Sequence, residues 1–551
     1  MTNIAADDSA QRRNMTLVVA ASSAGTMFEW YDFFIFGSLA AIIAHHFFST
    51  AGETQGFIFA LLTFAAGFAV RPLGALVFGR FGDLTGRKRT FIVTMSVMGL
   101  ATVAVGFLPD YNTIGVAAPY MLIGLRILQG FAIGGEYGGA AIYVAEHSRP
   151  GKRGAATGWI QVSASFGLLL ALGVILVTRT IMGEDAFVAW GWRIPFLLSA
   201  VLLGISLWIR LKLDESPMFK KIQAAGKASK APVSEAFLRW SNLKIVLLVL
   251  FAVLMGQGVV WYMAQFYTQF FLERVMKVEP AVVNALIMGI TAAGAPLFLF
   301  FGWLSDHVGR KPVMAFGLAL AAISYFPGFH MLTNAVNPAL AQASHKAPVS
   351  VVANPADCSI QFDMIGKAKF VSSCDIAKST LTGLGIPYNN EAAPKSGSAI
   401  VAIGSQTLES PEGTGLSGDA LSHATAQFKT QLQTALTAAG YPARAETGKI
   451  NIPLTLAILM VFVLAAAALY GPQAAALVEL FPTRIRYTAM SVPYHVGVGW
   501  FGGFLPATAF AIVAATGNIY AGLWYPVIIS GIGFILTAFF LPETHKRDLE
   551  A

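Results

Sequence analysis

The chain has 551 residues, of which 56% are hydrophobic and only 12% are charged. Soluble domains carry about 25% charged residues, so this composition excludes an ordinary soluble protein and indicates several membrane-spanning segments. The formal net charge is +8, but the basic residues are spread over short loops beside apolar runs. We therefore expect the lipid bilayer, and not nucleic acid, as the large partner.

A helix that crosses a membrane needs about 20 mostly apolar residues, and the chain contains twelve runs of roughly this length or more. In chain order they lie near residues 16–48, 56–79, 90–108, 117–146, 154–178, 193–213, 243–272, 281–304, 313–332, 452–480, 486–515 and 518–541. The sequence therefore predicts an all-α membrane protein with twelve transmembrane helices. The expected domains are a six-helix bundle over 1–215, a cytoplasmic linker over 216–242 and a second six-helix bundle over 243–551.

One charged loop occurs in both halves of the chain. Residues 79–89 read GRFGDLTGRKR, residues 302–311 read GWLSDHVGRK, and each loop lies between two apolar runs. The repeat indicates two homologous, pseudo-symmetric bundles, which is how secondary transporters build a site that opens to either side in turn. We therefore expect this chain to move a small solute across a membrane.

The repeated loops also contain residues that we expect to form a gate. An aspartate at one helix end can accept N–H groups from the positive end of another helix, and basic side chains can hold carboxylates or helix-end carbonyls across an interface. The predicted gating residues are Asp83, Arg87, Lys88, Glu146, Asp306, Arg310 and Lys311. The alternative is that the basic residues only set the orientation and contact lipid headgroups.

Lysine and arginine gather in the loops after the second, fourth, sixth, eighth and tenth runs and in both tails. The loops after the first, third and eleventh runs contain neither residue. Because short basic loops stay in the cytoplasm, both termini are predicted to be cytoplasmic.

Residues 333–449 contain no apolar run and interrupt the second bundle. Glu146 has a counterpart in Glu479, and Glu215 has one in Glu543. These pairs are more widely spaced than the two charged loops by roughly 105–110 residues, which is the expected size of an insertion. Since the insert follows the ninth run, it is predicted to be extracytoplasmic.

The insert is expected to form a small α/β subdomain, with short strands at 349–353 and 398–404 and an amphipathic helix at 417–440. A largely disordered loop is the alternative. Cys358 and Cys374 are the only two cysteines of the chain. An even pair within one extracytoplasmic segment predicts a disulfide, and two free thiols are the alternative.

Ionisable side chains inside membrane-spanning runs cost at least roughly 2.5–3.5 kcal/mol at the bilayer centre, so they usually line a cavity or pair with each other. A buried carboxylate beside a solute site can take up a proton on one side of the membrane and release it on the other. The candidates for this proton coupling are Asp32, Glu29 and Glu136. The candidates for binding the solute are Arg126, Arg71, Gln129, Tyr31, Tyr494 and His495. The alternative is a fixed ion-pair network between helices, with a structural histidine and aromatic residues that only pack.

Several further motifs accompany the charged loops: RILQG at 126–130, EWYDFF at 29–34, VRPLG at 70–74, GGEYGG at 134–139, WRIPF at 192–196, DESP at 214–217 and ELFPTRIR at 479–486. As a set they resemble the major facilitator superfamily and, within it, the metabolite:proton symporter family. The resemblance implies proton-coupled uptake of a small organic acid or zwitterion; the known solutes of the family include α-ketoglutarate, citrate, shikimate, proline and betaine. It also implies a multi-pass protein of the bacterial inner membrane that is functional as a monomer.

Two other functions stay open at this point. Proton-coupled efflux is the alternative to import, although the fifth run contains no proline and so lacks the Gly-Pro motif typical of drug antiporters. A membrane transceptor that senses through the insert is the other. The sequence contains no nucleotide loop, metal-ligand cluster or nucleophile elbow, so we expect no enzymatic activity, no cofactor and no metal.

Overall fold

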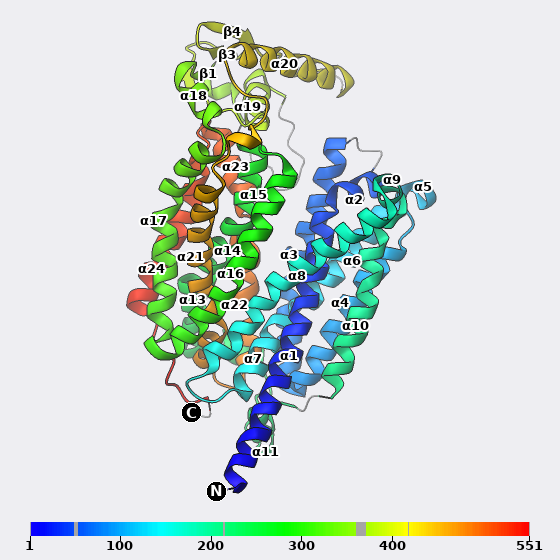
Figure 1. The fold of residues 1–551 in the computed structure, drawn as a ribbon, viewed down its shortest axis with the longest axis vertical. Helices are drawn as coiled ribbons and strands as arrows, with labels where there is room; N and C mark the ends of the chain where they lie inside the picture. The colour runs from blue at the N-terminus through cyan, green and yellow to red at the C-terminus, as the bar shows by residue number, and fades with distance from the viewer. Residues whose placement is uncertain (1, 49–52, 213–214, 360–370, 417, 550–551) are drawn as a thin grey trace.

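The computed structural model describes residues 2–48, 53–212, 215–359, 371–416 and 418–549, and over these residues the chain is helical apart from one small sheet (Figure 1). The first half contains α1 (Thr2–Ser38), α2 (Ala40–Phe47), α3 (Glu53–Thr85), α4 (Arg87–Phe107), α5 (Tyr111–Ile114), α6 (Ala117–Ile133), α7 (Glu136–His147), α8 (Arg153–Met182), α9 (Glu184–Ala186), the π-helical turn η2 (Phe187–Gly191) and α10 (Arg193–Leu211).

Two short helices, α11 (Pro217–Ala224) and α12 (Pro232–Phe237), lead into the second half. Its helices outside the insert are α13 (Trp240–Val249), η3 (Leu250–Leu254), α14 (Met255–Tyr262), η4 (Met263–Tyr267), α15 (Thr268–Phe270), η5 (Phe271–Val275), α16 (Pro280–Val308), α17 (Arg310–Val336), α21 (Ile452–Leu480), α22 (Arg486–His495), η8 (Val496–Gly502), α23 (Leu505–Thr516), η9 (Ala521–Leu523) and α24 (Trp524–Phe540).

Nine helical segments of the described chain are long and apolar enough to cross a membrane. They coincide with the predicted runs 3 to 10 and with run 12. The three remaining runs fall on α1–α2, α3 and α22–α23, which are also helical. A helix satisfies its backbone N–H and C=O groups internally, which is what a lipid environment requires.

The helices form two bundles that stand side by side (Figure 1). In the first bundle α1 packs on α8, α3 on α6 and α4 on α10, and in the second bundle α17 packs on α21 and α24. The bundles meet where α8 contacts α16 and where α3 contacts α22. These two contacts are equivalent under the internal repeat, since α3 and α16 precede the charged loops. The N- and C-termini lie at the same end of the molecule (Figure 1).

The fourth predicted run, 117–146, is divided in two by Gly134 and Gly135. Helix α6 ends at Ile133 and α7 begins at Glu136. The break places an acidic side chain in the first turn of a helix, where the free N–H groups favour negative charge.

The insert forms a four-stranded sheet with strand order β2-β1-β3-β4. Its elements are α18 (Pro338–Lys346), β1 (Val349–Ala353), η6 (Pro355–Asp357), α19 (Ser373–Gly383), β2 (Asn389–Ala392), β3 (Ile400–Ile403), β4 (Gln406–Glu409), α20 (Gly418–Ala438) and η7 (Thr447–Lys449). Strand β1 is parallel to β2 and antiparallel to β3. The small α/β subdomain is confirmed, and α17 continues to Val336, past residue 333 at which the insert is predicted to start. Residue 417, the predicted start of the amphipathic helix, lies outside the described residues.

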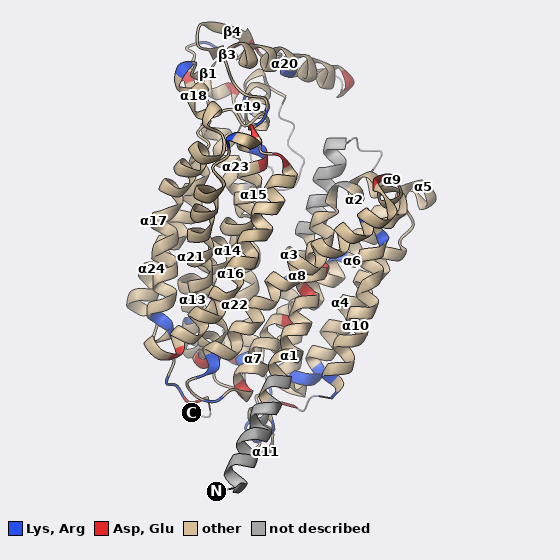
Figure 2. Cartoon of the chain, viewed as in Figure 1, with Lys and Arg blue, Asp and Glu red and all other residues tan. Residues whose placement is uncertain are grey.

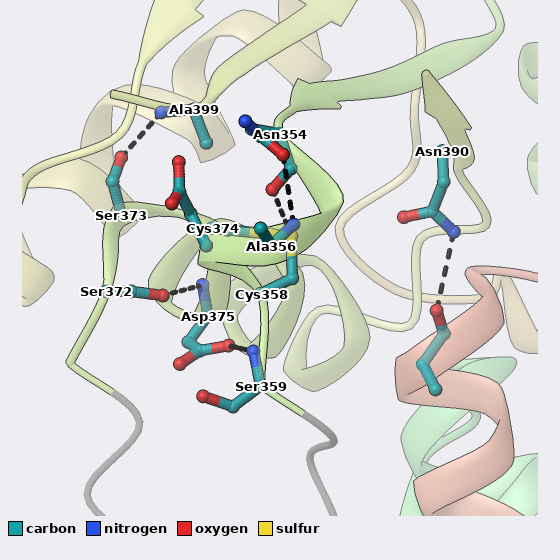
Figure 3. Close-up of a disulfide and its surroundings, with 12 residues drawn as sticks. Asn354, Ala356, Cys358, Ser359, Ser372, Ser373, Cys374, Asp375, Asn390 and Ala399 are labelled. Carbon is teal, nitrogen blue, oxygen red and sulfur yellow. Dashed lines mark hydrogen bonds between the residues drawn. A yellow bond between two sulfur atoms is a disulfide. The ribbon is translucent and has the colours of Figure 1, made fainter. Parts of the chain in front are cut away.

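The insert sits on the end of the second bundle opposite to the termini (Figure 1). Tyr388 donates its hydroxyl to the Ala514 carbonyl at 2.5 Å. Asn390, which is labelled in Figure 3, donates to the Thr516 carbonyl at 2.8 Å. These contacts bind β2 and the turn before it to the end of α23. The Lys277 ammonium, just after η5, donates to a carbonyl at the end of α19 at 2.9 Å. The insert is thus anchored to two helix ends of one bundle.

The two ends of the insert lie next to each other. The backbone N–H of Asn451 donates to the carbonyl of Ala335 at 2.9 Å, so the chain leaves α17 and returns to α21 at almost the same point. The subdomain therefore occupies the place of an ordinary loop between two neighbouring helices.

Cys358 and Cys374 are joined by a disulfide, with their Cα atoms 5.3 Å apart (Figure 3). The bond ties the segment after β1 to the first turn of α19. Replacing both cysteines with serine is expected to lower the free energy of unfolding of the insert by about 3 kcal/mol, because the bond closes a sequence separation of 16 residues. Limited proteolysis of the purified protein measures this effect. Reduced wild type should be cleaved as fast as the variant, and unchanged cleavage in both would contradict the expectation.

Candidate functional site

Asp32 of α1 lies at a small cavity inside the first bundle. Ser199 of α10 donates its hydroxyl to the Asp32 carboxylate at 2.6 Å, and Gln129 of α6 donates to the Thr102 hydroxyl of α4 at 2.6 Å. The cavity is lined by Asp32, Phe33, Gly67, Arg71, Met98, Thr102, Arg126, Gln129, Gly130 and Ile133. Four candidate residues from three helices therefore meet at one place: an acid, two arginines and a glutamine.

The two arginines reach the cavity from α3 and α6. Gly130 of α6 lies directly against the backbone of Gly67 on α3, and a Cβ at Gly130 would overlap that backbone. The absence of a side chain at Gly130 therefore lets the two helices approach closely. The Arg126 guanidinium lies 3.5 Å from the centre of the Phe36 ring. Within the described residues, the Arg126 Nε and one of its Nη atoms have no hydrogen-bond partner. Buried donors that remain unpaired are costly unless a ligand satisfies them, and arginine presents them in a fork that matches a carboxylate.

Glu29 and Glu136 form a second acidic group, and Arg210 of α10 is their cation. Glu136 is fully buried, and an Nη atom of Arg210 lies 3.7 Å from its Oε1. In the sequence Arg210 stands at the end of the sixth run, 193–213, where a basic residue ordinarily faces the membrane boundary. Helix α10 continues to Leu211 and turns the Arg210 guanidinium inward, 3.1 Å from the centre of the Phe91 ring.

Tyr494 and His495 come from the end of α22 in the second bundle. The Tyr494 ring stacks on Tyr137 of α7 with the ring centres 3.9 Å apart, which joins the two bundles. The Tyr494 hydroxyl lies 3.0 Å from that of Tyr470 on α21. His495 is buried, and its Nε2 has no hydrogen-bond partner in the described part of the chain. Tyr31 does not line the cavity; its hydroxyl donates to a backbone carbonyl of α10 at 2.8 Å.

Asp83 and Asp306 occupy equivalent positions at the end of the molecule that bears the termini. Asp83, near the end of α3, accepts the N–H groups of Tyr487 and Thr488 in the first turn of α22 at 3.2 and 2.9 Å. Asp306, near the end of α16, accepts two N–H groups in the first turn of α8 at 2.9 and 2.8 Å. Each aspartate therefore binds the positive end of a helix in the opposite bundle.

Two buried ion pairs lie beside these aspartates and also cross between the bundles. Arg486 lies 2.7 Å from Glu146, and Arg153 lies 3.5 Å from Glu479. Both arginines are the first residues of the helices whose N–H groups the aspartates hold. We call the contacts of Asp83, Asp306 and these two ion pairs the latch.

The arginines of the charged loops support the latch in different ways. Arg87 donates to the carbonyl of Thr483 in the opposite bundle at 2.8 Å. Arg310 remains within its own bundle, where it lies 3.1 Å from Glu479 and 2.7 Å from Asp306. Of these two arginines, Arg87 contacts the opposite bundle, whereas the ion pairs of Arg310 lie within its own bundle over the described residues.

The two lysines of the charged loops bind within their own bundles. The Lys88 ammonium donates to a carbonyl at the end of α10 at 3.1 Å, and the backbone N–H of Lys311 donates to Glu543 at 3.1 Å. Gly86 precedes α4 with a φ value of 111°, and Gly309 precedes α17 with a φ value of 107°. Only glycine adopts such values readily. Burial raises the pKa of Glu543. The backbone N–H groups that donate to its carboxylate together lower the pKa by more than this, so the pKa lies below its ordinary value.

Two similar helical bundles that surround buried charges have the architecture of a secondary transporter. The family model described as "Major Facilitator Superfamily" matches residues 23–344, and the model described as "Sugar (and other) transporter" matches residues 430–551. The chain therefore belongs to the major facilitator superfamily of membrane transporters.

The chain is similar to transporters of several metabolites. It is 38% identical to the shikimate transporter of Escherichia coli strain K12 over 318 residues, which cover 56% of this chain and 71% of the relative. It is 27% identical to the glycine betaine/proline/ectoine/pipecolic acid transporter of Dickeya dadantii over 554 residues, which cover 99% of this chain and 86% of the relative. A solved structure of the proton:xylose symporter XylE shares the fold, with a TM-score of 0.62 at 15% identity and 98% of both chains covered.

Proposed function

We propose that the chain imports a small organic acid or a zwitterionic metabolite together with protons, by alternating access. The observation that carries this proposal is the cavity at which Asp32 meets Arg126 and Arg71, because a proton and a solute carboxylate would bind there side by side. The relatives named for shikimate and for glycine betaine and proline agree with this substrate class.

Each candidate residue has a proposed role. Asp32 carries the proton, with Glu29 and Glu136 as further proton sites, and Arg126, Arg71 and Gln129 hold the solute. Tyr494 and His495 complete the site from the second bundle, and Tyr31 keeps α1 in register with α10. The unpaired donors of Arg126 support this assignment, since a solute carboxylate would satisfy them.

We propose a monomer with twelve transmembrane helices, arranged as bundles over 1–215 and 243–551 with the linker 216–242 between them. The end that bears both termini would be cytoplasmic and the insert extracytoplasmic. The placement of the insert at the end opposite the termini supports this orientation (Figure 1). Charged residues gather at the end with the termini and in the insert, and few lie along the middle of the bundles (Figure 2).

The latch would keep the cytoplasmic end closed while the solute enters from outside. For release, the bundles would separate there, and the N–H groups of α8 and α22 would lose the two aspartates. Because the latch consists of charge-assisted hydrogen bonds between helix ends, it offers two discrete arrangements and not a continuous range.

Asp83→Asn is expected to slow transport while solute binding is kept. The N–H groups of Tyr487 and Thr488 bind different oxygens of the carboxylate, so the amide keeps one acceptor and turns an NH2 group toward the other donor. The loss of one charge-assisted hydrogen bond costs about 1.5 kcal/mol, the lower end of its usual range. The population of the state with a closed cytoplasmic end would therefore fall by roughly tenfold. The step that closes this end again after solute release would be slower. Transport rate and solute binding measured on the same preparation test this, with Asp306→Asn as the symmetric variant and the exposed Asp185→Asn as a control. A wild-type rate in both latch variants would contradict the proposed role.

Uptake into proteoliposomes tests the proposed function itself. Labelled organic acids, proline and betaine would be offered with an inward proton gradient and again with a protonophore. Gradient-dependent accumulation of one of them supports symport and identifies the substrate class. Export of a solute under the reversed gradient, with no accumulation of any, would favour the antiporter instead.

A further inference from the structure

We propose that Arg210 is a positioning residue for the transported proton, because it competes with that proton for the carboxylate of Glu136. The inference rests on the proposed proton symport and adds to it a cation that none of the solute-binding assignments includes. When Glu136 takes up a proton, the Arg210 guanidinium is released from it. When the proton leaves, Arg210 binds the carboxylate again.

The contact between the two residues is buried but weakly bonded. Arg210 is 2% exposed and Glu136 is 0% exposed. Within the described residues, none of the three nitrogen atoms of Arg210 and neither oxygen atom of Glu136 has a hydrogen-bond partner. A buried ion pair stabilises a fold only when hydrogen bonds satisfy both partners, so this pair is a poor structural device. A contact that is close but unsatisfied can instead be exchanged for a proton at low cost.

The position of Arg210 is nevertheless fixed by its surroundings. A Cβ added at Gly25 of α1 would overlap the guanidinium, so this glycine leaves the space that Arg210 fills. The centre of the Phe91 ring on α4 lies 3.1 Å from the guanidinium carbon. The slot between α1 and α4 thus holds the cation at Glu136 whether or not an ion pair is present.

Charge balance gives the cation its function. Around the cavity and Glu136, three acids lie among three arginines: Asp32, Glu29 and Glu136 with Arg71, Arg126 and Arg210. A proton that enters this group, or a solute carboxylate that binds an arginine, changes the balance by one charge. Unpaired charge in a membrane interior is expensive. The binding of a proton therefore changes the free energy with which the solute carboxylate binds, and the solute changes that of the proton equally.

The groups that face this pair connect it with the latch. Glu29 and Asp32 act on it electrostatically from α1, Tyr143 from α7 and Tyr487 from α22. The Tyr487 hydroxyl donates to the carbonyl of Gly135, the residue immediately before Glu136. The backbone N–H of Tyr487 is one of the two that Asp83 holds in the latch. Opening the latch would therefore withdraw a side chain that now fixes the backbone at Glu136.

The test is the pH profile of uptake and of solute exchange in Arg210→Gln. Without its competing cation, Glu136 would keep its proton, so we expect gradient-driven accumulation to fall by about tenfold, within the usual range for coupled sites. The dependence of accumulation on pH should flatten, while exchange without a gradient remains. Arg210→Lys keeps a cation and should retain the pH dependence. Lys212→Gln removes an exposed positive charge two residues away and is the matched control.

The double variant Arg210→Gln/Glu136→Gln separates coupling from a structural role and guards against misfolding of the single variant. A merely structural pair would be replaced by two neutral amides, and accumulation with the wild-type pH profile would return. If Arg210 instead competes with the proton, the double variant keeps exchange and its pH profile stays flat. A wild-type profile in Arg210→Gln or in the double variant would overturn the inference. Absence of gradient-driven uptake in the wild type would overturn the symport on which the inference rests.

Discussion

Asp32→Asn is expected to abolish proton-driven accumulation while leaving solute exchange intact. The amide oxygen can still accept the hydroxyl of Ser199, which now lies 2.6 Å from the carboxylate, so the packing of α1 against α10 is kept. What the variant loses is the ability to take up and release a proton. Accumulation should then fall to the level set by simple equilibration, because the proton gradient would no longer be coupled to the solute.

Counterflow of labelled against unlabelled solute measures exchange, and uptake under an imposed proton gradient measures accumulation. Asp110→Asn is the matched control, since Asp110 is a partly exposed acid in the turn before α5 and does not line the cavity. Normal accumulation in Asp32→Asn would clear this residue of the role. Loss of both activities would indicate that the carboxylate binds the solute or holds the bundle together.

Arg126→Lys should lose most of its affinity for the solute. A lysine keeps the positive charge but replaces a planar fork with a point charge, so it cannot bind both oxygens of a carboxylate. It also loses the guanidinium face that rests 3.5 Å from the centre of the Phe36 ring. The loss of one charge-assisted hydrogen bond costs about 1.5–3 kcal/mol, which corresponds to roughly a 10- to 150-fold weaker affinity.

The concentration dependence of counterflow gives this affinity without any proton gradient. Arg179→Lys is a suitable control, because Arg179 also lies over an aromatic ring, 4.8 Å from that of Phe187, and pairs with Glu184 away from the cavity. Unchanged affinity in Arg126→Lys would identify a structural arginine.

The latch could be predicted from the sequence only in part. Asp83 and Asp306 stand out because the charged loop is repeated, and an acid at a helix end has an obvious partner in the N–H groups of another helix. Arg153 and Arg486 count in the sequence merely as basic residues that set orientation. The sequence contains a further signal: Arg153 follows Glu146, and Arg486 follows Glu479, at the same spacing of seven residues.

The charged residues around the cavity could be predicted from the sequence, except for Arg210. Asp32, Arg71 and Arg126 are recognisable because a charge in the middle of an apolar run has no ordinary explanation. Arg210 stands at the end of such a run, where the bilayer boundary makes a basic residue ordinary. Only the packing of α10 against α1 and α4 reveals that its side chain points inward.

The membrane helices could be predicted from the sequence, but two strands of the insert could not. The run 452–480 and helix α21 coincide, because length and apolar character suffice to define a buried membrane helix. Strands β2 and β4 escape prediction, since β2 is exposed at every position and β4 at all but one. Their pairing with β1 and β3 is a tertiary effect and leaves no alternation of apolar and polar residues to detect.

The hydrogen bond between Asn451 and Ala335 has a consequence for how such a chain can arise. Because the insert leaves and re-enters the second bundle at one point, acquiring it does not require the helices to be repacked. Gain, loss or exchange of the subdomain would be nearly neutral for the membrane core. The insert and the helical bundles that bear it can therefore have separate evolutionary histories.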